Sequence, residues 1–149
     1  MFNDYLDHIF LMVLTTFVFT SLIMPFMNII ANHIGAIDIP KDDRRVHNKP
    51  IPKLGGLGIF SGFLFGYMLF GIQSIEMNSI LIGSFIIIMY GILDDIKTLD
   101  AKYELLGQLI AASTIVFYGQ ILLTEVTVMG ATIEFGILSY PITIFFIVF

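Results

Sequence analysis

The sequence contains no cysteine, and only 13% of its 149 residues are charged. The absence of cysteine excludes disulfides, thiolate metal sites and a cysteine nucleophile. Soluble domains carry about 25% charged residues, so this chain has too little charge to cover a soluble globule. Its 57% hydrophobic content and mean hydropathy of +0.93 indicate an integral membrane protein. The net charge of −5 argues against a nucleic-acid partner, because binding nucleic acid requires a basic face.

Long runs without Asp, Glu, Lys or Arg define the expected membrane helices. Four runs hold 30, 22, 17 and 20 residues and cover 8–37, 54–75, 77–93 and 105–124. A hydrocarbon core needs about 17–25 helical residues, so each run predicts one crossing. We expect an all-α polytopic helix bundle with four complete transmembrane helices at about 9–30, 54–75, 77–93 and 105–124.

The last charge-free run, 135–149, holds 15 residues, which is short of a full crossing. It predicts a truncated fifth helix at about 139–149. We therefore expect residues 1–149 to form a single membrane domain, the N-terminal part of a longer protein. Asp4 and Asp7 stand where a signal peptide would carry Lys or Arg, so we expect no cleaved signal.

All seven basic residues fall in two loops, at 38–53 and 94–104. Two predicted crossings separate these loops, so the loops share one face of the membrane. The opposite face receives acidic residues and no Lys or Arg. The positive-inside bias therefore predicts that both loops are cytoplasmic and that the N-terminus is outside.

Two apolar segments carry smaller signals. Residues 126–135 favour strands around Gly130-Ala131, which predicts a small extracytoplasmic hairpin, with an irregular loop as the alternative. Gly58, Gly62 and Gly66 recur every four residues, and such a row lets another helix approach closely. We expect that contact within the chain, with a homodimer as the alternative.

The first loop is rich in cations and contains three prolines, which fix φ and stiffen it. Arg44, Arg45 and His47 lie between the prolines. The planar fork of arginine suits phosphate oxygens, so the loop predicts a phosphorylated ligand. The alternative is a basic cluster that sets topology and touches lipid head groups.

The second loop follows the third apolar run and begins with two adjacent carboxylates, Asp94 and Asp95. These repel one another at the negative end of a helix dipole, so a cation should offset them. Mg²⁺ carried with substrate phosphates would do so, and Lys102 could reach the same place. The alternative is a pair of boundary caps in water, although boundary carboxylates favour a functional role.

Both loops together resemble those of the polyprenyl-phosphate N-acetylhexosamine-1-phosphate transferases. The first loop is also similar to the branch of that family that uses UDP-GlcNAc or related UDP-sugars. The residues that carry the resemblance are Asp38-x-Pro40-x-x-x-Arg44-Arg45-x-His47-x-x-Pro50-x-Pro52-x-x-Gly55-Gly56 in the first loop, and Asp94-Asp95, Ala101-Lys102 and Leu106-Gly107-Gln108 in the second.

The resemblance implies an enzyme of the bacterial cytoplasmic (inner) membrane. It would transfer a sugar-1-phosphate from a UDP-N-acetylhexosamine to undecaprenyl phosphate, release UMP and so initiate synthesis of a cell-envelope glycan. The implied cofactor is Mg²⁺, with Mn²⁺ as the alternative. The active site would be cytoplasmic, and residues 1–149 alone would be inactive.

The resemblance also implies roles for six residues. Asp94 and Asp95 would bind the metal and position the acceptor, with proton abstraction by Asp94 a secondary role. A further metal-binding Asp is expected beyond residue 149. The residues expected to contact phosphate are Arg44, Arg45, His47 and Lys102.

Two other classes stay open. One is a different membrane enzyme of isoprenoid phosphates, although the chain has no Asp-x-x-Asp-Gly signature. The other is a non-catalytic lipid-binding or transporter fragment, which would need broken helices. The four complete runs contain only one proline, Pro25, and so give that reading little support.

Overall fold

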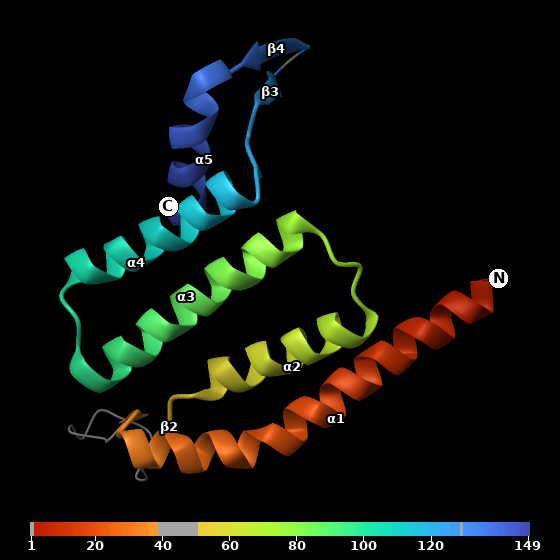
Figure 1. Ribbon diagram of the computed structural model, residues 1–149, viewed down its shortest axis with the longest axis vertical. Helices are drawn as coiled ribbons and strands as arrows, with labels where there is room; N and C mark the ends of the chain where they lie inside the picture. Colours follow the sequence, from red (N-terminus) through yellow and green to blue (C-terminus); the bar gives the residue numbers. More distant parts are fainter. Residues whose placement is uncertain (1, 39–50, 129) are drawn as a thin grey trace. The chain divides into compact units, whose positions relative to one another are not determined.

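The computed structural model describes residues 2–38, 51–128 and 130–149 and is mostly helical (Figure 1). Within these ranges two helices are long and apolar enough to cross a membrane: His8–Ile34, in α1 (Phe2–Ile34), and α3 (Ile75–Lys97). Their apolar side chains are widely exposed, including Phe10 at 67%. Exposed aromatic side chains suit lipid better than water, which agrees with the predicted helical membrane class.

The other helices are shorter. They are α2 (Gly55–Phe70), α4 (Ala101–Ser113) with its π-helical extension η1 (Thr114–Tyr118), the 3-10 turn η2 (Gly136–Leu138) and α5 (Ser139–Val148).

The observed bounds differ from the predicted runs, most clearly in α2. This helix has 16 residues, about 24 Å at 1.5 Å per residue, and ends before the predicted residue 75. Gly71 donates its backbone N–H to the Tyr67 carbonyl but has ψ 146° and leaves the helix. The linker 71–74 carries no charge either, so a charge-free run overestimates the length of its helix.

Contacts divide the chain into two compact units, Met1–Ile72 with Ile92–Thr98, and Gln73–Gly91 with Leu99–Phe149. In the first unit, α1 and α2 pack antiparallel through the glycine row. A Cβ at Gly58 would meet Met24, one at Gly62 would lie 1.8 Å from Thr20 Oγ1, and one at Gly66 would meet Thr16. The predicted helix contact within the chain is therefore confirmed.

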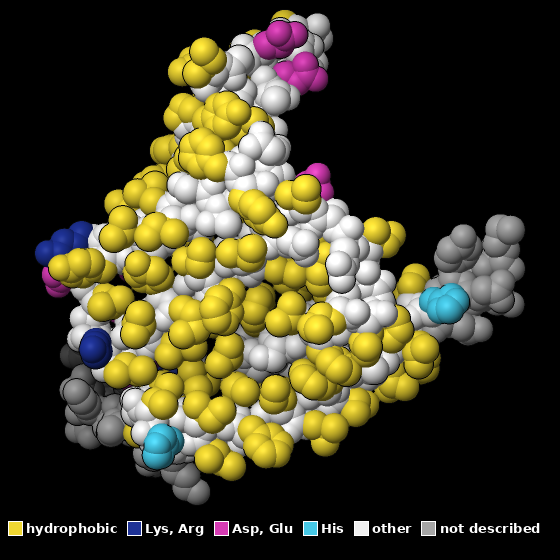
Figure 2. Space-filling view, in the orientation of Figure 1, with side chains coloured by type: hydrophobic (Ala, Val, Ile, Leu, Met, Phe, Trp, Pro, Cys, Tyr) yellow, Lys and Arg dark blue, Asp and Glu magenta, His cyan; other side chains and the backbone are white. Residues whose placement is uncertain are grey.

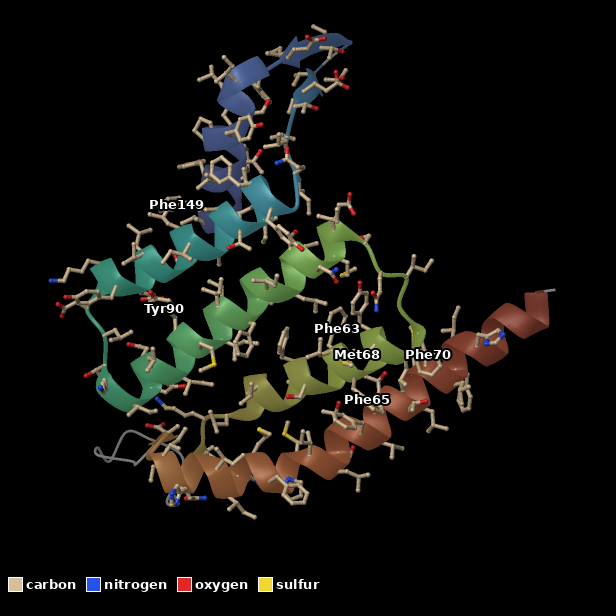
Figure 3. All side chains as sticks on the ribbon, viewed as in Figure 1. Phe63, Phe65, Met68, Phe70, Tyr90 and Phe149 are labelled. Carbon is tan, nitrogen blue, oxygen red and sulfur yellow. The ribbon has the colours of Figure 1, made fainter. Side chains whose placement is uncertain are left out.

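Aromatic side chains continue the α1–α2 contact of the first unit. Phe65 of α2 stacks on Phe19 of α1, with ring centroids 4.0 Å apart (Figure 3). The stacked rings are next in sequence to Gly66 and Thr20, which belong to the close contact between the two helices.

The first unit also contains a two-stranded sheet at the base of the first loop. Strands β1 (Ile37–Asp38) and β2 (Ile51–Pro52) pair antiparallel. The Lys53 N–H extends the pairing by donating to the Ala36 carbonyl at 2.9 Å. Although no strand was predicted here, the pairing brings the two ends of the loop together.

The second unit packs α3 against α4 and carries a hairpin. Tyr90 of α3 covers Gly107 of α4, where a Cβ would meet the ring at 2.6 Å (Figure 3). Strands β3 (Glu125–Val128) and β4 (Ala131–Glu134) form the predicted hairpin.

The predicted turn of this hairpin was wrong by one residue. Ala131 is paired with Val128 and therefore belongs to the strand. Gly130 has φ 85°, a left-handed conformation that glycine adopts without steric cost. The register of the strand pair determines the position of the turn, and the sequence alone does not determine that register.

Candidate active site

The two predicted catalytic carboxylates lie in the last turn of α3. Asp94 and Asp95 are both half-buried. The backbone N–H of Thr98 donates to the Asp94 carbonyl at 2.7 Å, and Thr98 has φ 46°. A left-handed residue that closes this bond is a common way to end a helix, so Thr98 fixes where α3 stops after the two carboxylates.

A lysine from the first loop contacts the second of these carboxylates. Lys53 Nζ lies 2.9 Å from Asp95 Oδ1, and the side chains are 37% and 29% exposed. All of these atoms belong to the first unit. The contact joins the base of the first loop to the start of the second. This agrees with the prediction that the two loops share one face of the membrane.

The hydrophobic core next to this ion pair determines which face of α3 is turned toward Lys53. Leu54, which follows Lys53, is 1% exposed and clusters with Met27, Ala31 and Ala36, and Ile92 packs against this cluster. Ile92 and Asp95 are three residues apart and therefore share one face of α3. The core contact at Ile92 thus places Asp95 beside Lys53.

The sequence predicts a cation near Asp94 and Asp95, and Lys102 was the candidate. Lys53 was not assigned to the site. One signal in the sequence could have identified Lys53. This lysine immediately precedes the predicted helix 54–75, Asp95 closely follows the predicted helix 77–93, and both positions lie on the predicted cytoplasmic face.

Lys102 has a different partner. Its Nζ lies 3.4 Å from Asp100 Oδ2 and 4.9 Å from the centroid of the Tyr103 ring. Both side chains of the ion pair are about 70% exposed, at 68% and 72%. Asp100 precedes α4, and the pair is local to the start of that helix. Its assignment to substrate phosphate stays a prediction.

The three other predicted phosphate contacts, Arg44, Arg45 and His47, lie outside the described residues, as does most of the first loop. The sheet β1–β2 nevertheless shows where that loop leaves and rejoins the fold, at Asp38 and Ile51. Both ends lie in the first unit, which also holds Asp95.

The carboxylates suit a hard cation that brings further ligands with it. Mg²⁺ is usually held by one or two protein carboxylates together with water and phosphate oxygens. In the part of the chain that the structure describes, no group of three or more His, Cys, Asp or Glu could hold a metal ion. The assignment of Mg²⁺ to Asp94 and Asp95 stays a prediction.

Charged and apolar side chains are separated over the visible surface (Figure 2). Apolar side chains cover the helices, whereas acidic side chains gather on the hairpin, which carries Glu125 and Glu134.

Comparison with known proteins identifies the family. Residues 77–149 match glycosyl transferase family 4. This stretch, just under half of the chain, is similar to that family. Glycosyl transferase family 4 is membrane-embedded, and the matched residues include Asp94, Asp95 and Lys102. The resemblance inferred from the two loops is thereby confirmed.

Curated relatives carry matching names. A probable undecaprenyl-phosphate N-acetylglucosaminyl 1-phosphate transferase of Bacillus subtilis (strain 168) is 41% identical over 129 residues, which are 85% of this chain and 36% of the relative. A decaprenyl-phosphate N-acetylglucosaminephosphotransferase of Mycobacterium leprae (strain TN) is 30% identical over 115 residues, 71% of this chain and 29% of the relative. The chain thus spans about a third of the length of these relatives. No solved structure matches it significantly.

Proposed function

We propose that the protein transfers a sugar-1-phosphate, GlcNAc-1-phosphate by the resemblance of its first loop, from a UDP-sugar to undecaprenyl phosphate. UMP is the second product, and the lipid-linked sugar starts a cell-envelope glycan. The observation that carries the proposal is the ion pair between Lys53 and Asp95. It joins the two loops that resemble one transferase family, and the relatives named above support the same reaction.

The chemistry requires positive charge more than a strong base. A phosphate monoester has a second pKa of about 6, so the lipid phosphate is mostly a dianion at neutral pH. Its oxygen attacks the β-phosphorus of the UDP-sugar, attached to the sugar, and the bond from that phosphorus to the oxygen bridging to UMP breaks. Both reactants are anionic, so neutralising and positioning them supplies most of the catalysis.

The residues divide this work between them. Asp94 and Asp95 would hold Mg²⁺, which when bound neutralises phosphate charge. Arg44, Arg45, His47 and Lys102 would contact phosphate oxygens, since guanidinium and ammonium groups donate several hydrogen bonds to them. Proton abstraction by Asp94 is a secondary role in this scheme.

The proposed topology places this chemistry at the cytoplasmic face of the bacterial inner membrane. The N-terminus would be outside, four helices would cross completely, and the loops 38–53 and 94–104 would face the cytoplasm. Reporters fused after Lys49 and after Thr98 should both be cytoplasmic, and one fused after Gly130 should be outside. Opposite locations for the first two reporters would contradict the proposed site.

The direct test is a transfer assay with the full-length protein in lipid nanodiscs. UDP-GlcNAc, undecaprenyl phosphate and Mg²⁺ are supplied, and both UMP and the lipid-linked product are measured. We expect equimolar formation of the two products, which stops when EDTA is added and resumes with excess Mg²⁺. UMP release without a lipid product, or the absence of both products, would contradict the proposal.

A further inference from the structure

Lys53 has a fixed backbone and a partner that the proposed mechanism also needs. Its N–H is bound to the Ala36 carbonyl at 2.9 Å, and the next residue, Leu54, is 1% exposed. The backbone at Lys53 is therefore fixed by its neighbours, and the four-carbon stem carries the ammonium away from it. Its ammonium lies 2.9 Å from Asp95 Oδ1, an oxygen that the proposed function assigns to Mg²⁺.

Two cations compete for this carboxylate. A Mg²⁺ ion binds its ligands at about 2.0–2.1 Å, so a metal ion on Oδ1 would lie within a few ångström of the Lys53 ammonium. Like charges at such a distance repel, and beside the half-buried Asp95 this repulsion is screened less than in bulk water. A metal ion and the observed ion pair therefore disfavour one another.

We propose that Lys53 is a positioning residue that occupies Asp95 in place of the metal and must leave this oxygen when a divalent cation binds. The inference rests on the proposed function, because it takes Asp95 as a metal ligand. The ammonium holds the carboxylate in position before the metal arrives and lowers the affinity of the metal-free protein for divalent cations.

The chain offers a matched control for Lys53. Lys97 also belongs to the first unit and lies on the same helix as Asp95, two residues further on. Residues two apart do not face one another on a helix. Lys97→Met therefore removes the same charge from the same region without removing the contact with Asp95.

The first measurement is binding of Mn²⁺ to the full-length protein in nanodiscs, followed by electron paramagnetic resonance of free Mn²⁺. Binding that is lost in Asp95→Asn defines the site. Lys53→Met, which keeps the stem, should lower the Kd about three- to tenfold because it removes a nearby positive charge. Lys97→Met should change it less than twofold, and Lys53→Arg should not tighten binding. Equal effects at positions 53 and 97, or weaker binding in Lys53→Met, would overturn the inference.

The second measurement follows the ammonium itself, through the rate at which an amine-acetylating reagent modifies each lysine. Saturating Mg²⁺ should raise the rate at Lys53 at least twofold and leave the rate at Lys97 unchanged. Asp95→Asn should raise the Lys53 rate without Mg²⁺. A Lys53 rate that ignores both changes would overturn the inference, whereas unchanged Mn²⁺ binding in Asp95→Asn would overturn the metal role in the proposed function and the inference with it.

Discussion

The two compact units each pair a carboxylate of the second loop with a lysine, but they do so differently. In the first unit, Lys53 and Asp95 are 42 positions apart and lie 2.9 Å from one another, and their side chains are 37% and 29% exposed. In the second unit, Lys102 and Asp100 are two positions apart, at 3.4 Å, and mostly exposed. The first contact depends on how the helices pack, whereas the second needs only the start of α4.

This difference distinguishes Asp95 from Asp100 as candidates for a metal ligand. An exposed local ion pair is screened by water and stabilises little. A partly buried carboxylate that a distant residue holds in place is restricted in position, as a metal ligand must be. The contrast therefore makes Asp95 the better candidate for a metal ligand, whereas Asp100 belongs to a local ion pair at the start of α4.

The largest expected effect compares the two carboxylates in catalysis. Asp95→Asn keeps the side-chain volume but removes the charge that would hold Mg²⁺, so it should lower kcat of the full-length protein more than about a hundredfold. Asp100→Asn should change kcat less than about threefold, since asparagine also serves at the start of a helix. The assay is transfer across a Mg²⁺ titration. A wild-type kcat in Asp95→Asn would instead favour the alternative in which Asp94 and Asp95 are boundary caps in water.

The next effect concerns glycines of the two units. Gly62→Ala should destabilise the first unit by about 1–3 kcal/mol, because its Cβ would overlap Thr20 and overpack the helix contact. Gly91→Ala, in the second unit, should be neutral or stabilise by about 0.5–1 kcal/mol, since nothing lies within 4 Å of its Cβ. Both are measured by unfolding in mixed micelles.

A double mutant sharpens the glycine comparison. Thr20→Ala removes the atoms that a Cβ at Gly62 would meet, so it should recover most of the stability lost in Gly62→Ala. Contacting residues are expected to give such non-additive changes. Additive losses in the double mutant would show that the α1–α2 contact does not depend on this pair.

The smallest effects come from the lysines. Lys53→Met should lower the free energy of unfolding by about 1 kcal/mol or less, because the pair is partly screened, and Lys102→Met by about 0.5 kcal/mol or less. The same micelle unfolding measurements apply, at low and high salt. A larger loss for Lys102→Met than for Lys53→Met would reverse the comparison of the two units.

Sequence reasoning located most helices but not their ends. The helices predicted at 77–93 and about 139–149 fall within or close to α3 (Ile75–Lys97) and α5 (Ser139–Val148). The run at 105–124 extends beyond η1, which ends at Tyr118. Charge is excluded from the membrane core, so hydropathy finds the helix, but uncharged linkers are also allowed near the membrane surface.

The candidate site was predicted in its residue types and incompletely in its contacts. Adjacent carboxylates after an apolar helix were visible as Asp94 and Asp95, because such charges are costly at a membrane boundary. Lys53 was not assigned to the site, because a sequence gives no measure of distance between residues far apart along the chain. The sheet β1–β2 was missed because two-residue strands carry no periodic signal.

The sequence by itself determined the helical membrane class, the family and the two loops, because these depend on composition, charge and local motifs. Only the tertiary structure decided which lysine meets Asp95, which face of α2 contacts α1, and where the hairpin turns. Each of these depends on packing between distant segments: Ile92 against the Leu54 cluster, glycines against threonines, and strand register. Such contacts form only when the chain is folded.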